Sequence, residues 1–261
     1  MLRLGSAALL ALGVFLLALP LTTASVARAD SIDYGNFGPQ FPPYGTIYRN
    51  VTESSATDGV PLYGAPELSG DVLDFDPVGL GAAAVEGHTD VTDGQLNFRI
   101  ATLEGAGVLS LLIVEGGDLT LFGTGTDATA VVAGASVRVD ILDVDGVPLA
   151  EPISVYKDAS FTLDLASDGP VVLAPWTNDL LVEFGPVLSE NEIPFELGVS
   201  RAEVVIDNFL LASSELDSTA FIQKKDFRIE PTIEGDPIPE PGVLALLAAG
   251  GGLLAIRRRP T

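Results

Sequence analysis

Three aspartates that lie close together are the clearest candidates for metal chemistry. Asp140, Asp143 and Asp145 fall within one short segment, and Ca²⁺ prefers six to eight oxygen ligands, with carboxylates among them. Their spacing does not match the twelve-residue loop D-x-[DN]-x-[DN]-G-x₅-E. The competing explanation is turn chemistry, because Asp145-Gly146 is typical of a tight hairpin with solvated acids around it. Calcium is the one cofactor that the sequence suggests, and these are its candidate ligands.

Carboxylate pairs are the second kind of candidate, because glycoside hydrolysis needs two of them about 5–10 Å apart across a groove. The chain has 36 acidic residues, so pairs arise by chance and carry no specific signal. The densest glutamate group, around Glu190, Glu192 and Glu196, contains Pro194 and is typical of a loop. His88 is the single histidine, and no G-x-S-x-G motif is present. We therefore predict no catalytic residues and a protein that is not an enzyme.

Aromatic residues offer a third kind of chemistry, the stacking of a ring on a sugar. Trp176 is the single tryptophan, between Pro175 and Thr177, and it is the candidate ligand residue of a polysaccharide-binding module. The alternative is that Trp176 belongs to the core or its rim. A single tryptophan in 261 residues offers little aromatic surface for stacking on a sugar. The sequence therefore leaves both interpretations of Trp176 open.

The segments that must position these residues follow a period of two, which is typical of β-strands. Asp145-Gly146 predicts a hairpin turn, and residues 115–118 (Glu-Gly-Gly-Asp) predict another turn. The strands predicted between these and other breaks are 95–102, 108–114, 119–122, 136–144, 147–156, 160–165, 171–174, 180–184, 202–212, 220–223 and 227–233.

About a dozen short strands without helical periodicity predict an all-β fold. We expect a single antiparallel β-sandwich, jelly-roll-like, over residues 30–237, flanked by an N-terminal signal helix and a C-terminal transmembrane helix. About 200 residues bury enough apolar surface to fold without covalent staples, and the chain has no cysteine with which to form a disulfide.

Composition excludes several classes of protein. With 13 basic and 36 acidic residues, the net charge is −23, which argues against a nucleic-acid partner. The absence of cysteine excludes thiolate metal sites and thiol nucleophiles. The folded part must be the acidic part, because basic residues are prominent at both ends of the chain.

Residues 1–29 have the pattern of a secretory signal peptide. Arg3 precedes an apolar run over residues 4–19, and Ala27 and Ala29 form an A-x-A cleavage site. Cleavage would leave Asp30 as the first mature residue. This predicts export through the Sec machinery and cleavage by signal peptidase.

Residues 238–261 have three parts in a fixed order. Pro239, Glu240 and Pro241 come first, an uncharged stretch over 242–256 follows, and Arg257, Arg258 and Arg259 come last. The prolines prevent a helix from starting earlier. We expect a short transmembrane helix at 242–256, with the arginines on the cytoplasmic side and the preceding domain outside.

This tripartite segment resembles the PEP-CTERM sorting signal found on exported proteins of Gram-negative bacteria. The resemblance implies a membrane-embedded exosortase as partner, with Pro239, Glu240 and Pro241 as the processing motif and Arg257, Arg258 and Arg259 as the stop. It implies transient anchoring in the inner membrane and then release to the cell surface or extracellular matrix. Segments of the middle domain resemble uncharacterised PEP-CTERM proteins that have no assigned activity, so this resemblance adds nothing on mechanism: 33–37, 62–66 and 206–210.

These observations predict an exported cell-surface or extracellular-matrix protein of structural or adhesive type. One alternative is a secreted module that binds exopolysaccharide, with or without calcium. The other is a carboxylate-based glycosidase. Two facing carboxylates in a cleft would favour the enzyme, and an exposed aromatic shelf would favour the binding module.

Overall fold

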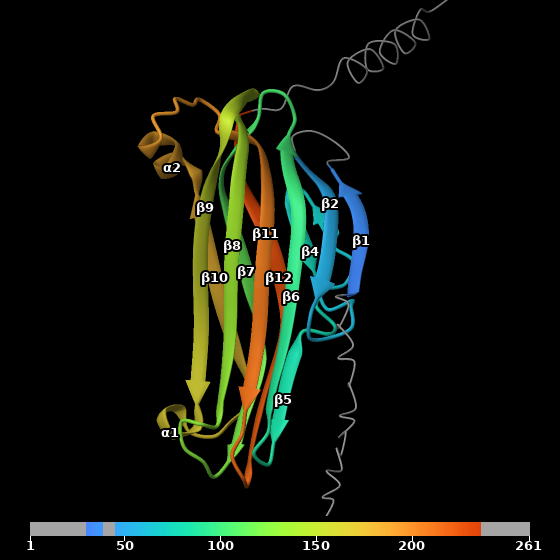
Figure 1. Cartoon of the computed structure of the whole chain (residues 1–261), viewed down its shortest axis with the longest axis vertical. Coiled ribbons are helices and arrows are strands. Elements are labelled where there is room, and N and C mark those ends of the chain that lie inside the picture. The colour runs from blue at the N-terminus through green and yellow to red at the C-terminus, as the bar shows by residue number, and fades with distance from the viewer. Residues whose placement is uncertain (1–29, 39–44, 236–261) are drawn as a thin grey trace, which may run out of the picture.

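The computed structural model describes residues 30–38 and 45–235, which form an all-β structure with antiparallel strands (Figure 1). The strands run along the long axis of the molecule, and two short helices lie at its opposite ends. The elements are β1 (Asp30–Phe37), β2 (Thr46–Ser55), β3 (Glu67–Ser69), β4 (Val72–Phe75), β5 (Gly81–Val85), β6 (Thr89–Thr102), β7 (Gly107–Gly123), β8 (Ala130–Val144), β9 (Val147–Asp164), α1 (Leu165–Asp168), β10 (Val171–Glu183), α2 (Phe184–Glu190), β11 (Val199–Ser213) and β12 (Ser218–Glu234).

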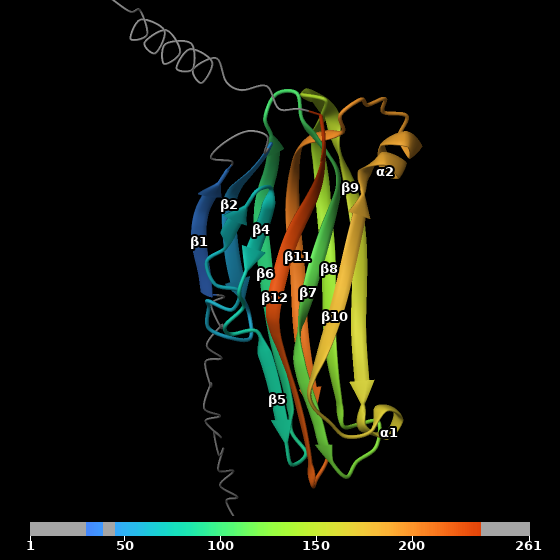
Figure 2. The same ribbon diagram turned by 180° about the vertical axis from the view of Figure 1, so that it is seen from behind.

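The strands form two layers that face each other, as the opposite views in Figures 1 and 2 show. The first layer has the order β1-β2-β6-β11-β8-β9. The second has β10-β7-β12, with β4 and β5 beyond β12 and β3 beside β4. Val199 of β11 pairs with Val108 of β7 and joins the layers into a nearly closed sheet.

The core lies between the layers and follows from the alternation of side chains along each strand. In β11, Val204, Ile206, Asn208 and Leu210 are fully or almost fully buried, while the alternate residues Val205, Asp207 and Phe209 face outward. Tyr63, Phe75 and Phe227 pack edge to face, with ring centroids 5.1–6.0 Å apart. Such packing adds to the area that these rings bury.

The hairpin predicted at Asp145-Gly146 is confirmed. Both residues have positive φ, 51° and 77°, and Val144 pairs with Val147 across the turn. This is the backbone twist that a two-residue turn needs between long strands. It joins β8 to β9.

The turn predicted at residues 115–118 is wrong, because these residues lie in the middle of β7. Gly116 and Gly117 do not break the strand but allow close approach. A Cβ on Gly117 would lie 1.8 Å from the carbonyl oxygen of Gln223, in the neighbouring strand β12. Their role is therefore to let two backbones pack closely.

Several predicted strands are also parts of longer ones. Strand β12 joins the predicted strands at 220–223 and 227–233 through Lys224-Lys225-Asp226, where the register shifts by a bulge. Strand β10 joins 171–174 to 180–183, because Phe184 already belongs to α2, and β9 joins 147–156 to most of 160–165. Charged residues inside these strands hid their continuity.

The signal peptide at 1–29 and the sorting signal at 238–261, with its helix at 242–256, lie outside the described residues. Among residues 30–38 and 45–235, no helix is long and apolar enough to cross a membrane.

Candidate functional site

The outer face of the first layer is hollowed near its middle. The hollow has a volume of ≈ 530 Å³ and crosses β2, β6, β11, β8 and β9. Its lining is rich in small and polar residues around one exposed aromatic side chain. The outward-facing residues in the lining are Ser54, Asp93, Gln95, Ser136, Asp158, Ser160, Asp207 and Phe209.

Strand register brings polar residues from distant parts of the chain into one row. Ser54 pairs with Gln95, Gln95 with Asp207, Asp207 with Ser136, and Ser136 with Asp158. The amide of Gln95 donates a hydrogen bond of 2.6 Å to Asp207 Oδ1. The row therefore presents donors and acceptors side by side across five strands.

Phe209 forms the apolar part of this face. Its side chain is 41% exposed, and it pairs with Asp93 on β6 and Gly134 on β8. A Cβ on Gly134 would lie 2.1 Å from Phe209 Cε1. The ring thus occupies the space that the missing side chain leaves and lies against the sheet. A larger residue at position 134 would push the ring away.

Asp93 forms one wall of the hollow by holding the segment after β2. Its Oδ1 accepts hydrogen bonds from Ser55, Ala56 and Thr57, at 2.7–2.9 Å. Burial acts to raise the pKa of Asp93, but these hydrogen bonds outweigh it and lower the pKa below its ordinary value. Asp93 is therefore a carboxylate at neutral pH, and its role is to position the wall.

A second hollow of ≈ 390 Å³ adjoins the first and shares Ser136, Asp158 and Asp207 with it. Tyr156 is 64% exposed beside it, and the Arg138 guanidinium lies 5.8 Å from the Tyr156 ring centroid. The two hollows place Phe209 and Tyr156 on one face. This arrangement suits an extended ligand better than a small compact one.

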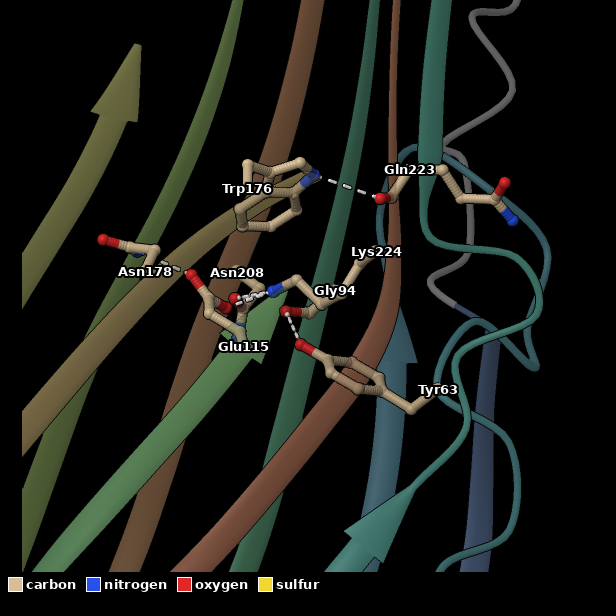
Figure 3. A network of polar contacts seen from close by, with 8 residues as sticks. All are labelled: Tyr63, Gly94, Glu115, Trp176, Asn178, Asn208, Gln223 and Lys224. Carbon is tan, nitrogen blue, oxygen red and sulfur yellow. Dashed lines mark hydrogen bonds and ion pairs between the residues drawn. The ribbon is translucent and has the colours of Figure 1, made fainter. Parts of the chain in front are cut away.

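Trp176, the ligand residue considered from the sequence, is a core residue. It is 3% exposed and stacks on Phe161 at a centroid distance of 5.8 Å. Its Nε1 donates a hydrogen bond to the carbonyl oxygen of Gln223 (Figure 3). A buried indole has no face to offer to a sugar, so the core interpretation of Trp176 holds.

The structure does not bring Asp140, Asp143 and Asp145 together as metal ligands. Asp140 pairs with Arg138 and Asp143 with Arg201, whereas Asp145 accepts backbone hydrogen bonds at residues 196–198. Within the ranges 30–38 and 45–235, no group of three or more His, Cys, Asp or Glu side chains is placed to hold a metal ion. Calcium binding stays a prediction without a site among these three residues.

A second polar cluster, which the sequence did not predict, lies between the layers (Figure 3). Lys224 and Glu115 are both fully buried and form an ion pair. Lys224 also contacts Asn208 Oδ1, and Asn178 donates a 2.6 Å hydrogen bond to Glu115 Oε1. The alternation of β12 places Lys224 on the inward side, and this could have indicated a buried lysine. Its charge instead suggested that the strand ends before it.

Comparisons with known proteins give no identification. No protein-family model matches the sequence, and no curated protein matches it. Among solved structures, the chain is similar to TmCBM61 in complex with beta-1,4-galactotriose, at 8% identity and a TM-score of 0.20, over 69% of this chain and 82% of that one.

Two further similarities are of the same order. The tailspike protein 4 enzymatically active domain of bacteriophage CBA120 is 12% identical, with a TM-score of 0.17, over 77% of this chain and 19% of that one. Lectin I-B4 from Griffonia simplicifolia, in its metal-free form, is 10% identical, with a TM-score of 0.18, over 78% and 99%. Similarities at these TM-scores indicate no function for this chain.

Proposed function

We propose that the domain binds an extended, neutral polysaccharide on the outer face of the first layer. The observation that supports this most is Phe209, an exposed ring that lies against Gly134 in the lining of a hollow whose other outward-facing side chains are polar. An apolar surface with a few convergent polar groups is the usual form of a ligand site.

The chemistry of the lining favours sugar hydroxyls. Carboxylates accept hydrogen bonds, whereas hydroxyls and amides both donate and accept them; Asp207, Ser136 and Gln95 supply one of each group in a single row. The ring of Phe209 supplies the apolar contact for the C–H face of a sugar. Asp93, Asp158 and Asp207 make the hollow acidic, which disfavours a uronic acid or sulfated chain.

This proposal extends to the location and kind of the protein. We infer an exported, jelly-roll-like sandwich without catalytic activity, sorted by an exosortase to the cell surface or matrix. Export is supported by the pattern of residues 1–29, and sorting by the order of parts in residues 238–261. In that setting, polysaccharide binding would make the protein a structural or adhesive component of the matrix.

Affinity electrophoresis in gels that contain single polysaccharides tests the binding. We expect retardation by at least one neutral galactan, glucan or mannan and none by alginate or polygalacturonate. Phe209→Ala should weaken the binding by about tenfold, because a buried aromatic contact contributes about 1.4 kcal/mol or more. Phe122→Ala is the matched control, because Phe122 is 60% exposed on the second layer.

The proposal fails if wild type binds none of the neutral polymers. It also fails if Phe209→Ala binds the polymer as well as the control Phe122→Ala does. Incubation with the retarding polymer, followed by a reducing-end assay, tests the absence of catalysis. Release of reducing ends by wild type that is lost in Asp207→Asn would favour the glycosidase instead.

A further inference from the structure

Three reactive groups meet in the dry interior between the layers. The Lys224 amine on β12 contacts both the Glu115 carboxylate on β7 and the Asn208 carboxamide on β11 (Figure 3). All three side chains are at most 2% exposed. An amine, an amide carbonyl and a carboxyl group in direct contact are the components of an amide-exchange reaction.

We propose that Lys224 and Asn208 join spontaneously through an isopeptide bond, with Glu115 as the acid–base group. The bond would form between Lys224 Nζ and Asn208 Cγ after folding, with loss of ammonia. It would link β12 of the second layer to β11 of the first.

Burial prepares the amine for attack. A protonated amine has no lone pair, and removal from water disfavours the charged form. Desolvation lowers the pKa of Lys224, although the charge of Glu115 and its hydrogen bond act in the opposite direction. Phe227, whose ring centroid lies 5.2 Å from Lys224 Nζ, helps to exclude water.

The proton balance closes within the three side chains. The Lys224 ammonium gives one proton to the Glu115 carboxylate, which leaves a neutral amine beside a carboxylic acid. The amine lone pair attacks Asn208 Cγ and forms the new C–N bond, while the carboxylic acid polarises Oδ1. A second amine proton then passes through Glu115 to Nδ2, the old C–N bond breaks, and ammonia leaves with the electron pair. No oxidant or cofactor takes part.

The contacts select Asn208 rather than Asn178 as the acceptor. Lys224 Nζ contacts Asn208 Oδ1, whereas Asn178 directs its amide nitrogen to Glu115 Oε1 at 2.6 Å. Asn208 Nδ2, the leaving group, is buried without a hydrogen-bond partner among the described residues. A buried unpaired donor is unfavourable, and its departure as ammonia removes that cost.

Fixed geometry makes the reaction between Lys224 and Asn208 fast enough to occur without an enzyme. Well-oriented groups within one molecule reach effective concentrations of about 10⁵ M or more. Lys224 cannot withdraw, because its backbone N–H donates to Leu80 O at 2.9 Å and its strand pairs with β7 on one side and β5 on the other. Folding would therefore set the reaction in motion without an enzyme.

Peptide mapping of the full chain tests the bond. Trypsin cuts after Arg201, Lys224 and Lys225, so Asn208 and Lys224 fall in one peptide. The folded chain, purified, denatured and digested, should lose cleavage after Lys224 and give residues 202–225 lighter by one ammonia, about 17 Da. Cleavage after Glu215 should then leave two chains still joined.

Variants assign the roles. Lys225→Arg is the matched control, since Lys225 is 52% exposed and pairs with Asp118, and it should keep the mass loss. Glu115→Gln and Lys224→Arg should both show the full sequence mass. Asn208→Asp should still form the bond but lose water, about 18 Da, because the leaving group changes.

The wild-type peptide alone can overturn the proposal, even if Glu115→Gln fails to fold. A peptide that ends at Lys224 with its sequence mass means that no bond forms. A loss of ammonia with cleavage after Lys224 retained means a cyclic imide at asparagine, which also overturns it. A mass loss that persists in Glu115→Gln removes the acid–base role from Glu115.

Discussion

At the scale of the residue, exposure decides which aromatic side chains can meet a ligand. Trp176 has the larger ring but is 3% exposed, whereas Phe209 is 41% exposed on the outer face. The difference follows from the alternation of side chains along a strand, because Trp176 faces inward on β10 and Phe209 faces outward on β11. A stability role for Trp176 and a binding role for Phe209 can therefore be separated by mutation.

We expect Trp176→Ala to lower the free energy of unfolding by about 3–5 kcal/mol, since it removes a buried ring and leaves a cavity. Urea denaturation followed by circular dichroism measures the change. The folded variant should bind polysaccharide as wild type does. A variant of unchanged stability that has lost binding would contradict the assignment of Trp176 to the core.

Asp145 allows a prediction about pH. Burial acts to raise its pKa, but backbone hydrogen bonds from Glu196, Gly198 and Leu197 outweigh this and lower the pKa below its ordinary value of 3.8. A folded-state pKa below the unfolded one contributes stability at pH above about 4, which is lost as the pH falls through the folded-state value. The carboxylate is thus a stabilising cap at neutral pH.

Asp145→Asn should therefore cost about 1–2 kcal/mol at pH 7, because it weakens hydrogen bonds to a charged group while the side chain still tolerates positive φ. The difference from wild type should hold between pH 5 and pH 8 and shrink below pH 4. Urea melts across this range give the curve. A difference that grows on acidification would show that the carboxylate is not the stabilising species.

The residues of the candidate site could be predicted only in part. The sequence indicates carboxylates and aromatic residues as candidates, but it does not predict the row that contains Gln95 and Asp207. These two residues are 112 positions apart and meet through the pairing of β6 with β11. Local patterns contain no information on which distant strands pair, so the sequence alone could not assemble the row.

At the scale of the element, glycines and charges inside strands explain the wrong boundaries. Gly116 and Gly117 are usually read as turn residues, yet they serve the close packing of β7 against its neighbours. Lys224 interrupts the apolar alternation of β12, and a bulge follows it. In contrast, Asp145-Gly146 lies between uninterrupted alternating segments, and that turn was predicted correctly.

Gly117→Ala tests the packing role. The added Cβ would lie 1.8 Å from Gln223 O, so β7 and β12 must separate, and we expect a loss of about 2 kcal/mol or more. Gly81→Ala is the matched control, because Gly81 pairs with the same Gln223 from the other side and its Cβ would stand 3.4 Å from the nearest atom. Equal melting temperatures for the two variants would refute the argument.

At the scale of the whole molecule, the all-β class followed from the sequence because period-two alternation recurs along the chain and helical periodicity does not. A sandwich was expected as well, but the assignment of strands to each layer, such as the pairing of β11 with both β6 and β8, did not follow. That assignment depends on contacts between residues far apart in sequence. The all-β class of this chain can be predicted from local sequence patterns, whereas its strand order depends on all the strands together.

The sorting proposal also belongs to this scale. We expect Glu240→Ala to abolish display on the cell surface while export continues, because it alters the motif proposed for the exosortase. Fractionation and surface labelling in a host that carries an exosortase measure both steps. Glu234→Ala, outside the motif, should be displayed normally. Normal processing of Glu240→Ala would remove the support for this kind of sorting.

The position of β12 has a mechanical consequence. Tension on the chain beyond Gly235 enters the domain through Glu234, the last residue of β12, whose ladder with β7 extends to Ser218. The hydrogen bonds of an antiparallel ladder are perpendicular to the strands, so a pull along β12 strains many of them at once in shear. A bond from Lys224 to Asn208 would pass that tension into β11 and the opposite layer. A chain with no cysteine would then resist extension equally well in oxidising and reducing surroundings.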